Sequence, residues 1–173
     1  MDILFIQTGG TIDKDYPKTV NGYSFEISEP AVKRIIKKIN PSFKFKIISF
    51  LKKDSLDITQ KEKEKLAALC KSEKIKKIII THGTDTMIET ANILQKIKNK
   101  TIILTGAFIP EKFKDSDAAF NIGCAIGAIR YLSEGAYIAM NGIVVRCDKV
   151  ERNTKTGQFI IKNEKIRLEQ PNK

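Results

Sequence analysis

Residues 4–13 read LFIQTGGTID. It begins as an apolar run of the strand type and stops at two glycines, beyond which stands the hydroxyl of Thr11. Glycines at the carboxyl end of a strand let the backbone approach a ligand closely, because no Cβ stands in the way and a positive φ costs nothing. We therefore expect a ligand beside Gly9 and Gly10, which Thr11 either binds or attacks.

Similar apolar, β-branched runs recur along the chain, and segments of helical periodicity lie between most of them. The runs lie at about 2–7, 44–50, 77–81, 101–105 and 136–145. This alternation predicts an α/β fold of three layers, in which helices cover both faces of a mainly parallel sheet.

Sequence signals for the start of a helix predict four helices between these strands. Glu29-Pro30 opens the first helix, and TQKE at 59–62 is a capping box for the second. The third is expected from about Asp85 to Lys98, and the fourth over about 116–132.

Length and composition predict one cytoplasmic domain. A chain of 173 residues can bury roughly 70% of the surface that its unfolded form exposes. It has no apolar stretch long enough to span a membrane and no signal sequence at its N-terminus. We expect a domain over residues 1–162 and a polar tail over 163–173. Three cysteines without a C-x-x-C pair argue against a disulfide framework and a zinc site.

The net charge of +11 raises the question of nucleic-acid binding. The excess is lysine spread along the chain, without interleaved arginine and aromatic residues. Lysines opposite apolar positions on amphipathic helices usually form a solvated face. We therefore predict no specific nucleic-acid partner and no membrane partner.

Three segments rich in glycine and threonine follow three of the predicted strands. TGGTI follows the first strand, THGTDT at 81–86 the third and TGAFIP at 105–110 the fourth. Parallel strands place their carboxyl ends on one rim, which is where ligands bind in such sheets. Each segment taken alone is equally well explained as a turn or a helix cap. Together they predict a site.

Several kinds of chemistry are excluded at this rim. TGGTI lacks the third glycine of G-x-G-x-x-G, and no G-x-x-x-x-G-K-[ST] is present. His82 is the only histidine and has no serine or cysteine nucleophile motif near it, so we expect it to be structural. What remains is hydroxyl chemistry at Thr11 and Thr84, a carboxylate at Asp85, and tyrosines after Thr11.

TGGTI, THGTDTMIETA and the later TGAFIP with SDAAFNIGCAIGA resemble the N-terminal domain of bacterial-type L-asparaginases and glutaminases. The resemblance runs over about residues 3–159. It implies hydrolysis of the side-chain amide of L-asparagine, with L-glutamine as a further substrate and without a cofactor. By this resemblance Thr11 is the nucleophile, Thr84 and Asp85 belong to a Thr-Asp-Lys group, and Ser55 binds the substrate α-carboxylate.

The resemblance and the residues together suggest how Thr11 would work. Its hydroxyl needs a base, and the lid-like segment 12–25 offers Tyr16, which we rank first, and Tyr23. We place Gly10 and Gly83 among the substrate-binding residues, because backbone amides at a Gly-Gly turn and a helix start can stabilise an oxyanion.

The position of the lysine of this group is ambiguous in VERNTKTGQF at 150–159. Alignment on MNG at 140–142 without gaps places it at Arg152, whereas an R-x-T-K pattern places it at Lys155. Arginine cannot accept a proton at neutral pH, but lysine can be deprotonated when it is desolvated. We expect Lys155 to carry the proton role and Arg152 to be an electrostatic support; the alternative is that both are surface cations.

The chain departs from the family in two places. Full-length members carry a smaller C-terminal domain, and a neighbouring subunit contributes a carboxylate to the site; we expect this chain to be of a short, single-domain group that self-associates as a homodimer or a dimer of dimers. Leu56 stands where many members have a polar residue. A competing hypothesis is a weakly catalytic domain that binds a small amino acid or a nucleotide as a sensor.

Overall fold

The computed structural model describes residues 2–20 and 22–162 and is built on a six-stranded sheet. The strand order is β10-β9-β8-β7-β1-β6, with β10 antiparallel to β9 and all other neighbours parallel. The strands are β1 (Asp2–Gly9), β6 (Lys44–Lys53), β7 (Lys77–Thr81), β8 (Thr101–Thr105), β9 (Gly135–Met140) and β10 (Ile143–Arg146). The predicted fold class, a mainly parallel sheet, is confirmed.

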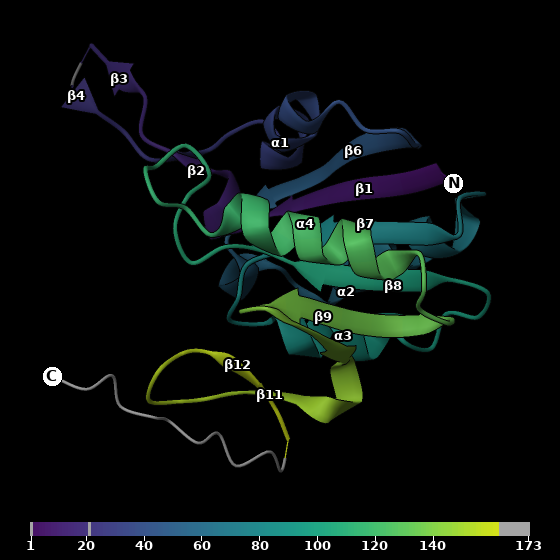
Figure 1. Cartoon of the computed structure of the whole chain (residues 1–173). Helices are drawn as coiled ribbons and strands as arrows, with labels where there is room; N and C mark the ends of the chain where they lie inside the picture. Colours follow the sequence, from purple (N-terminus) through teal and green to yellow (C-terminus); the bar gives the residue numbers. More distant parts are fainter. Residues whose placement is uncertain (1, 21, 163–173) are drawn as a thin grey trace, which may run out of the picture.

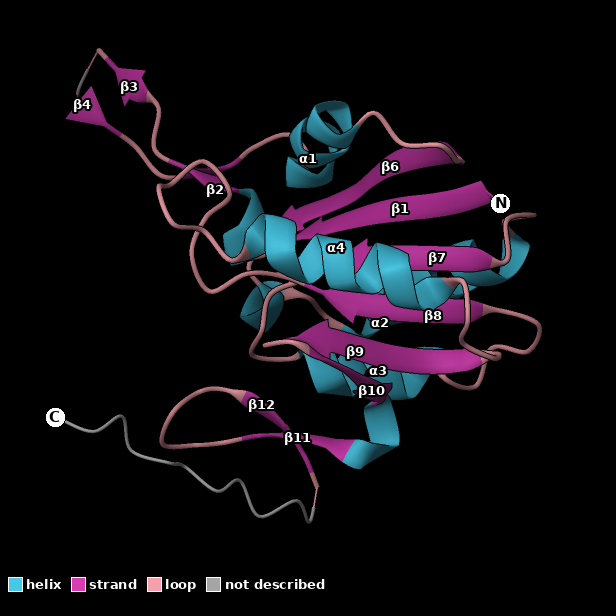
Figure 2. Cartoon of the chain, in the orientation of Figure 1, coloured by secondary structure: helices cyan, strands magenta, loops and turns pink. Residues whose placement is uncertain are grey.

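Helices cover both faces of this sheet (Figure 1). They are α1 (Ala31–Ile39), α2 (Gln60–Ser72), α3 (Met87–Leu94) and α4 (Ala118–Ile129). Alternate residues of each central strand point to opposite faces, so that Phe5 packs with α1 and α4, whereas Leu4 packs with α2 and α3. The three-layer arrangement is visible in Figure 2, where α1 and α4 lie in front of the sheet and α2 and α3 behind it.

The capping box predicted for α2 is present. The backbone N–H of Glu62 donates to Thr59 Oγ1 over 3.3 Å, and the backbone N–H of Thr59 donates to Glu62 Oε2 over 2.9 Å. α1 begins directly after Pro30, as predicted. α3 and α4 are each shorter than predicted, by two residues or more at either end.

One predicted strand is wrong. The apolar run at 136–145 is two strands, because the chain turns back at Asn141 and Gly142, whose φ angles are 52° and 82°. Positive φ at both central residues matches the twist of a two-residue hairpin.

Three short two-stranded ladders lie outside the central sheet. β2 (Lys14–Asp15) pairs with β5 (Glu26–Ile27), β3 (Lys18–Thr19) with β4 (Gly22–Tyr23), and β11 (Val150–Arg152) with β12 (Phe159–Ile161). The β3–β4 hairpin projects beyond the ends of the sheet strands (Figure 1). The segment 12–25, predicted to lack regular elements, thus contains part of two such ladders. The predicted tail at 163–173 lies outside the described residues.

The cysteines are free: Cys70 and Cys147 are buried and Cys124 is half-buried. Among the described residues, the helices are all too short or too polar to cross a membrane.

Candidate active site

The loops after β1 and β7 touch through their glycines. A Cβ at Gly10 would lie 2.3 Å from the backbone nitrogen and 2.4 Å from the Cα of Gly83. Gly10 also has a φ of 82°, and its N–H donates to the carbonyl of Lys53 over 2.9 Å. No other residue type fits at Gly10, because any Cβ would overlap the facing backbone. The expectation that TGGTI and THGTDT share one rim is met, and what approaches Gly10 within the chain is Gly83.

Ser55 lies against the same glycine from a third loop, which follows β6. A Cβ at Gly83 would lie 2.6 Å from Ser55 Oγ. Ser55 is fully buried, and its hydroxyl has no hydrogen-bond partner within the part of the chain that the structure describes. Thr86 holds this loop in place, because its Oγ1 donates to the carbonyl of Ser55 over 2.9 Å. A buried hydroxyl without a partner is costly, which suggests that a bound ligand uses it.

The two threonines stand next to the touching glycines. Thr11 is the first residue of the 3-10 turn η1 (Thr11–Asp13) and is half-buried. Thr84 directly follows Gly83 and is buried to 8% exposure. Because Gly10 and Gly83 are in contact, the chain brings both threonines to one place on the rim, with Ser55 beside them.

Asp85 is paired with Arg152. Arg152 Nη1 donates to Asp85 Oδ1 over 2.5 Å, and Arg152 Nε donates to the carbonyl of Gly157 over 3.1 Å. The guanidinium also lies over the ring of Phe108, 5.9 Å from its centroid. These contacts hold the cation on the candidate site, and a hollow of about 270 Å³ borders Arg152.

Lys155 is exposed, in the turn that joins β11 to β12. Its backbone N–H donates to Asn153 Oδ1 over 2.9 Å, and within residues 2–20 and 22–162 its ammonium group pairs with no carboxylate. Of the two candidates for the family's lysine position, the structure brings Arg152 to Asp85 and leaves Lys155 away from it.

The third segment, 105–110, is held on the rim by Asp117. Its carboxylate accepts the N–H groups of Phe108 and Ile109, each over 3.0 Å, and the amide of Asn121 over 2.9 Å. A Cβ at Gly106 would lie 2.4 Å from the carbonyl oxygen of His82, so this loop too packs on the THGTDT loop.

His82 is structural, as expected. Its ring is fully buried, with Nδ1 at 2.8 Å from the carbonyl of Gly83 and Nε2 at 3.0 Å from Thr90 Oγ1. Burial lowers the pKa of His82 to about 4, so the ring is neutral at pH 7.

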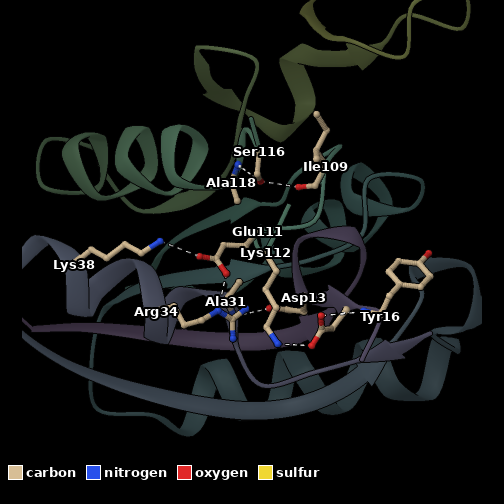
Figure 3. A network of polar contacts seen from close by, with 11 residues as sticks. Asp13, Tyr16, Ala31, Arg34, Lys38, Ile109, Glu111, Lys112, Ser116 and Ala118 are labelled. Atoms are coloured by element: carbon tan, nitrogen blue, oxygen red, sulfur yellow. Dashed lines mark hydrogen bonds and ion pairs between the residues drawn. The ribbon is translucent and has the colours of Figure 1, made fainter. Parts of the chain in front are cut away.

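Tyr16 lies in an aromatic cluster. Its ring centroid is 5.8 Å from those of both Phe25 and Phe113, and its side chain is 44% exposed. Figure 3 shows the ring pointing away from Asp13. The side chain of Tyr23, the other candidate base, lies outside what the structure describes.

Asp13 is a buried residue of the site that sequence reasoning missed. Its Oδ1 accepts the N–H of Ala31 over 2.7 Å and so joins η1 to the start of α1 (Figure 3). Its Oδ2 accepts from Thr81 Oγ1 over 3.4 Å. Burial raises the pKa of Asp13 to about 6 despite these bonds. Asp13 is thus a positioning residue that fixes the turn carrying Thr11.

The described part of the chain holds no group of three His, Cys, Asp or Glu side chains that could bind a metal ion. The site instead combines hydroxyls, glycine backbone and one ion pair. Hydroxyls beside backbone amides can support nucleophilic attack on a carbonyl and stabilise the oxyanion that forms.

Comparison with known proteins agrees with this chemistry. The family model described as Asparaginase, N-terminal, matches residues 2–164. A glutaminase-asparaginase from Acinetobacter glutaminasificans is 28% identical over 92% of this chain and 52% of its own length. A probable periplasmic L-asparaginase from Haemophilus influenzae is 30% identical over 90% of this chain and 47% of its own length.

Solved structures show the same fold. The thermostable L-asparaginase from Thermococcus kodakarensis is similar with a TM-score of 0.81 and 25% identity, over 95% of this chain and 52% of that one. A probable cytoplasmic L-asparaginase from Campylobacter jejuni is similar with a TM-score of 0.74 and 25% identity, over 93% of this chain and 53% of that one. The chain spans about half the length of the relatives it matches.

Proposed function

Because the chain belongs to the family of asparaginase N-terminal domains, we propose that it hydrolyses the side-chain amide of L-asparagine, and of L-glutamine as a second substrate, to the acid and ammonia. The reaction runs through an acyl-enzyme on Thr11 and needs no cofactor. The observation that carries the proposal is the contact of Gly10 with Gly83 beside the unpartnered hydroxyl of Ser55.

Each step has a candidate group. Thr11 Oγ attacks the amide carbon, and its proton passes to a base. We assign stabilisation of the oxyanion to the backbone N–H of Gly83, because the N–H of Gly10 already donates to the carbonyl of Lys53 over 2.9 Å. The amide nitrogen takes up a proton and leaves as ammonia, and water then hydrolyses the ester on Thr11. Ser55 Oγ donates to the substrate α-carboxylate, which would give a partner to a buried hydroxyl that has none among residues 2–20 and 22–162.

Tyr16 remains our first choice of base. It lies on the segment that follows η1, and its contacts with Phe25 and Phe113 are at the surface. Tyr16 acts as the base only if the segment folds over Thr11 when substrate binds. Tyr23 is the alternative on the same segment.

Arg152 serves as a fixed charge next to Asp85. A guanidinium group cannot act as a proton acceptor at neutral pH, so Arg152 orients the carboxylate and stabilises negative charge but shuttles no proton. Lys155 would carry the proton only if the turn at 153–156 moved toward Asp85.

The direct test is ammonia release from L-asparagine, L-glutamine and D-asparagine. Thr11→Ala should lower kcat by more than about tenfold, because it removes a covalent nucleophile, while Ser72→Ala, at an exposed hydroxyl at the end of α2, serves as the control. Mass spectrometry of the quenched reaction should find an acyl adduct on the peptide that contains Thr11. Thr11→Ala with more than a tenth of the wild-type rate would disprove the mechanism.

A weakly catalytic sensor domain is the second candidate. The pairing of Asp85 with Arg152 favours it, because an arginine cannot take part in proton transfer. Calorimetry would then detect binding of an amino acid or nucleotide that Ser55→Ala weakens, in a protein that releases no ammonia.

We also propose that the protein self-associates as a homodimer or a dimer of dimers. Large apolar side chains are exposed near the rim, among them Phe108, Ile109 and Phe113. Symmetric association would cover them and exclude water from the site. Sedimentation of an active monomer would contradict this. A cytoplasmic location remains a proposal, since similar proteins are named as cytoplasmic and as periplasmic.

A further inference from the structure

A hollow of about 660 Å³ lies at the end of the sheet opposite the candidate active site. It is bordered by the end of α2, by the segment that leads into β7 and by the segment that leads into β8. In a parallel strand the first and last residues lie at opposite ends. Because Lys76 precedes β7 and Thr84 follows it, the hollow and the site lie at opposite ends of this strand.

Five exposed lysines surround this hollow: Lys71, Lys74, Lys76, Lys96 and Lys98. None of the five forms an ion pair with a carboxylate of residues 2–20 or 22–162. Nearby carboxylates are few: Glu73 Oε1 accepts from Lys46 over 2.8 Å, Glu134 accepts the N–H of Asn99 over 2.8 Å, and Asp2 lines an adjoining hollow with Lys74 and Lys76. The five lysines thus outnumber these carboxylates, and the hollow carries an excess of positive charge.

A sixth lysine at the hollow, Lys100, differs from these five because it has a structural role. Lys100 is buried, and its Nζ donates to the carbonyl of Glu73 and, over 3.0 Å, to that of Ile75. These two hydrogen bonds join the segment before β7 to the segment before β8 and fix the two groups of exposed lysines relative to each other. Assembled like charges repel and destabilise the folded chain, which a bound polyanion would relieve.

Apolar side chains complete the hollow. Ala67, Ile93 and Ile97 line it, and Ala67 and Ile97 also pack on the core beneath. A bare anion would leave this surface exposed, whereas a ligand with both a charged chain and a flat apolar group would use the whole lining.

We propose that this hollow binds a nucleoside triphosphate, with its phosphates on the exposed lysines and its base on the apolar wall. The volume lies within the range of small-molecule sites. Lysine contacts phosphate as a point charge and needs no glycine-rich loop, so the site is independent of the phosphate-binding motifs that the sequence lacks.

The test measures binding of ATP, tripolyphosphate and adenosine to the whole chain by calorimetry, at about 0.15 M salt and without divalent cations. ATP should bind more tightly than tripolyphosphate, and adenosine should not bind measurably. Lys74→Glu with Lys96→Glu should weaken ATP by at least about tenfold. The matched control is Lys61→Glu with Lys65→Glu, which changes the net charge equally on the exposed surface of α2 and should leave the affinity unchanged.

Thermal unfolding gives a second readout. Without ligand, the Lys74→Glu, Lys96→Glu variant should melt at a higher temperature than the wild type, because repulsion is relieved, and ATP should no longer raise its Tm. Equal affinity for ATP and tripolyphosphate, equal weakening by the control pair, or preference for an RNA oligonucleotide over ATP would each overturn the proposal.

Discussion

At the level of single residues, the role of each group in the site depends on which other residues it contacts in the folded chain. Thr11 and Thr84 could be named from motifs, because each stands beside a glycine at a strand end, whereas Ser55 could be named only through the family resemblance. Asp13 and Asp117 could not, because the first binds Ala31 and the second the loop at Phe108, contacts that only the folded chain makes. From the sequence alone, a carboxylate in a turn is interpreted as a helix cap or as a charge exposed to solvent.

Substitution of Ser55 should affect stability and substrate binding differently. Its hydroxyl is buried and unpartnered, so Ser55→Ala removes a desolvated group without breaking a bond and should leave the free energy of unfolding unchanged or raise it by up to about 1 kcal/mol. If the hydroxyl binds the substrate carboxylate, KM for L-asparagine should rise by at least about tenfold. Urea unfolding and ammonia release measure the two effects. An unchanged KM would remove Ser55 from the substrate site.

The ion pair of Asp85 with Arg152 gives a second prediction. Arg152→Met should lower kcat/KM by about 10- to 100-fold, because it removes the charge-assisted bond of the half-buried Arg152 to the exposed Asp85. Arg152→Lys should keep or raise kcat, since lysine restores a cation that can also lose a proton. Lys155→Met is the matched control, and from its exposed position we expect less than about twofold change. Loss of turnover in Lys155→Met alone would assign the proton role to Lys155 instead.

At the scale of elements, the sequence determined the strands better than their turns. The runs at 77–81 and 101–105 agree with β7 and β8, because strands buried on both faces are continuously apolar and end where polar residues begin. The run at 136–145 was wrongly predicted as one strand because Asn141-Gly142 lies inside an otherwise apolar stretch. That dipeptide is nevertheless a strong hairpin signal. The ladders around 12–25 are two residues per strand, too short for any periodicity to predict.

The contact between the loops after β6 and β7 can be tested by adding a methyl group at Gly83 and removing the side chain of Ser55. Gly83→Ala would place a Cβ 2.6 Å from Ser55 Oγ and should cost about 1–3 kcal/mol of folding free energy. Adding Ser55→Gly should recover part of that loss, because it vacates the space. Gly10→Ala, which meets backbone at 2.3 Å, should not be rescued by Ser55→Gly. Chemical unfolding of the wild type, Gly83→Ala, Ser55→Gly and their double variant gives the coupling energy, and strict additivity of Gly83→Ala with Ser55→Gly would contradict the contact.

At the scale of the whole molecule, two buried groups make opposite contributions to stability. Burial raises the pKa of Asp13 from 3.8 to about 6, so between these values the folded chain holds more protons than the unfolded one, and stability falls as pH rises. Burial lowers the pKa of His82 from 6.5 to about 4, so over nearly the same interval the unfolded chain holds more protons, and stability rises with pH. Each effect is of the order of 3 kcal/mol at about 1.4 kcal/mol per pKa unit.

These two effects should nearly cancel in the wild type and be revealed one at a time by substitution. Asp13→Asn keeps an oxygen for the N–H of Ala31 but cannot titrate, so its stability should rise by about 2–3 kcal/mol from pH 4 to pH 6 relative to the wild type. His82→Gln should show the opposite slope. Below pH 4 the carboxylates whose pKa values are lowered add a loss of stability common to all three proteins; they are Asp15, Glu29, Asp54 and Glu62. Urea unfolding at pH 4, 5, 6 and 7 measures the slopes. If Asp13→Asn and the wild type gave parallel curves, Asp13 would be ionised throughout, and the turn that carries Thr11 would be held by a charge rather than by a neutral acid.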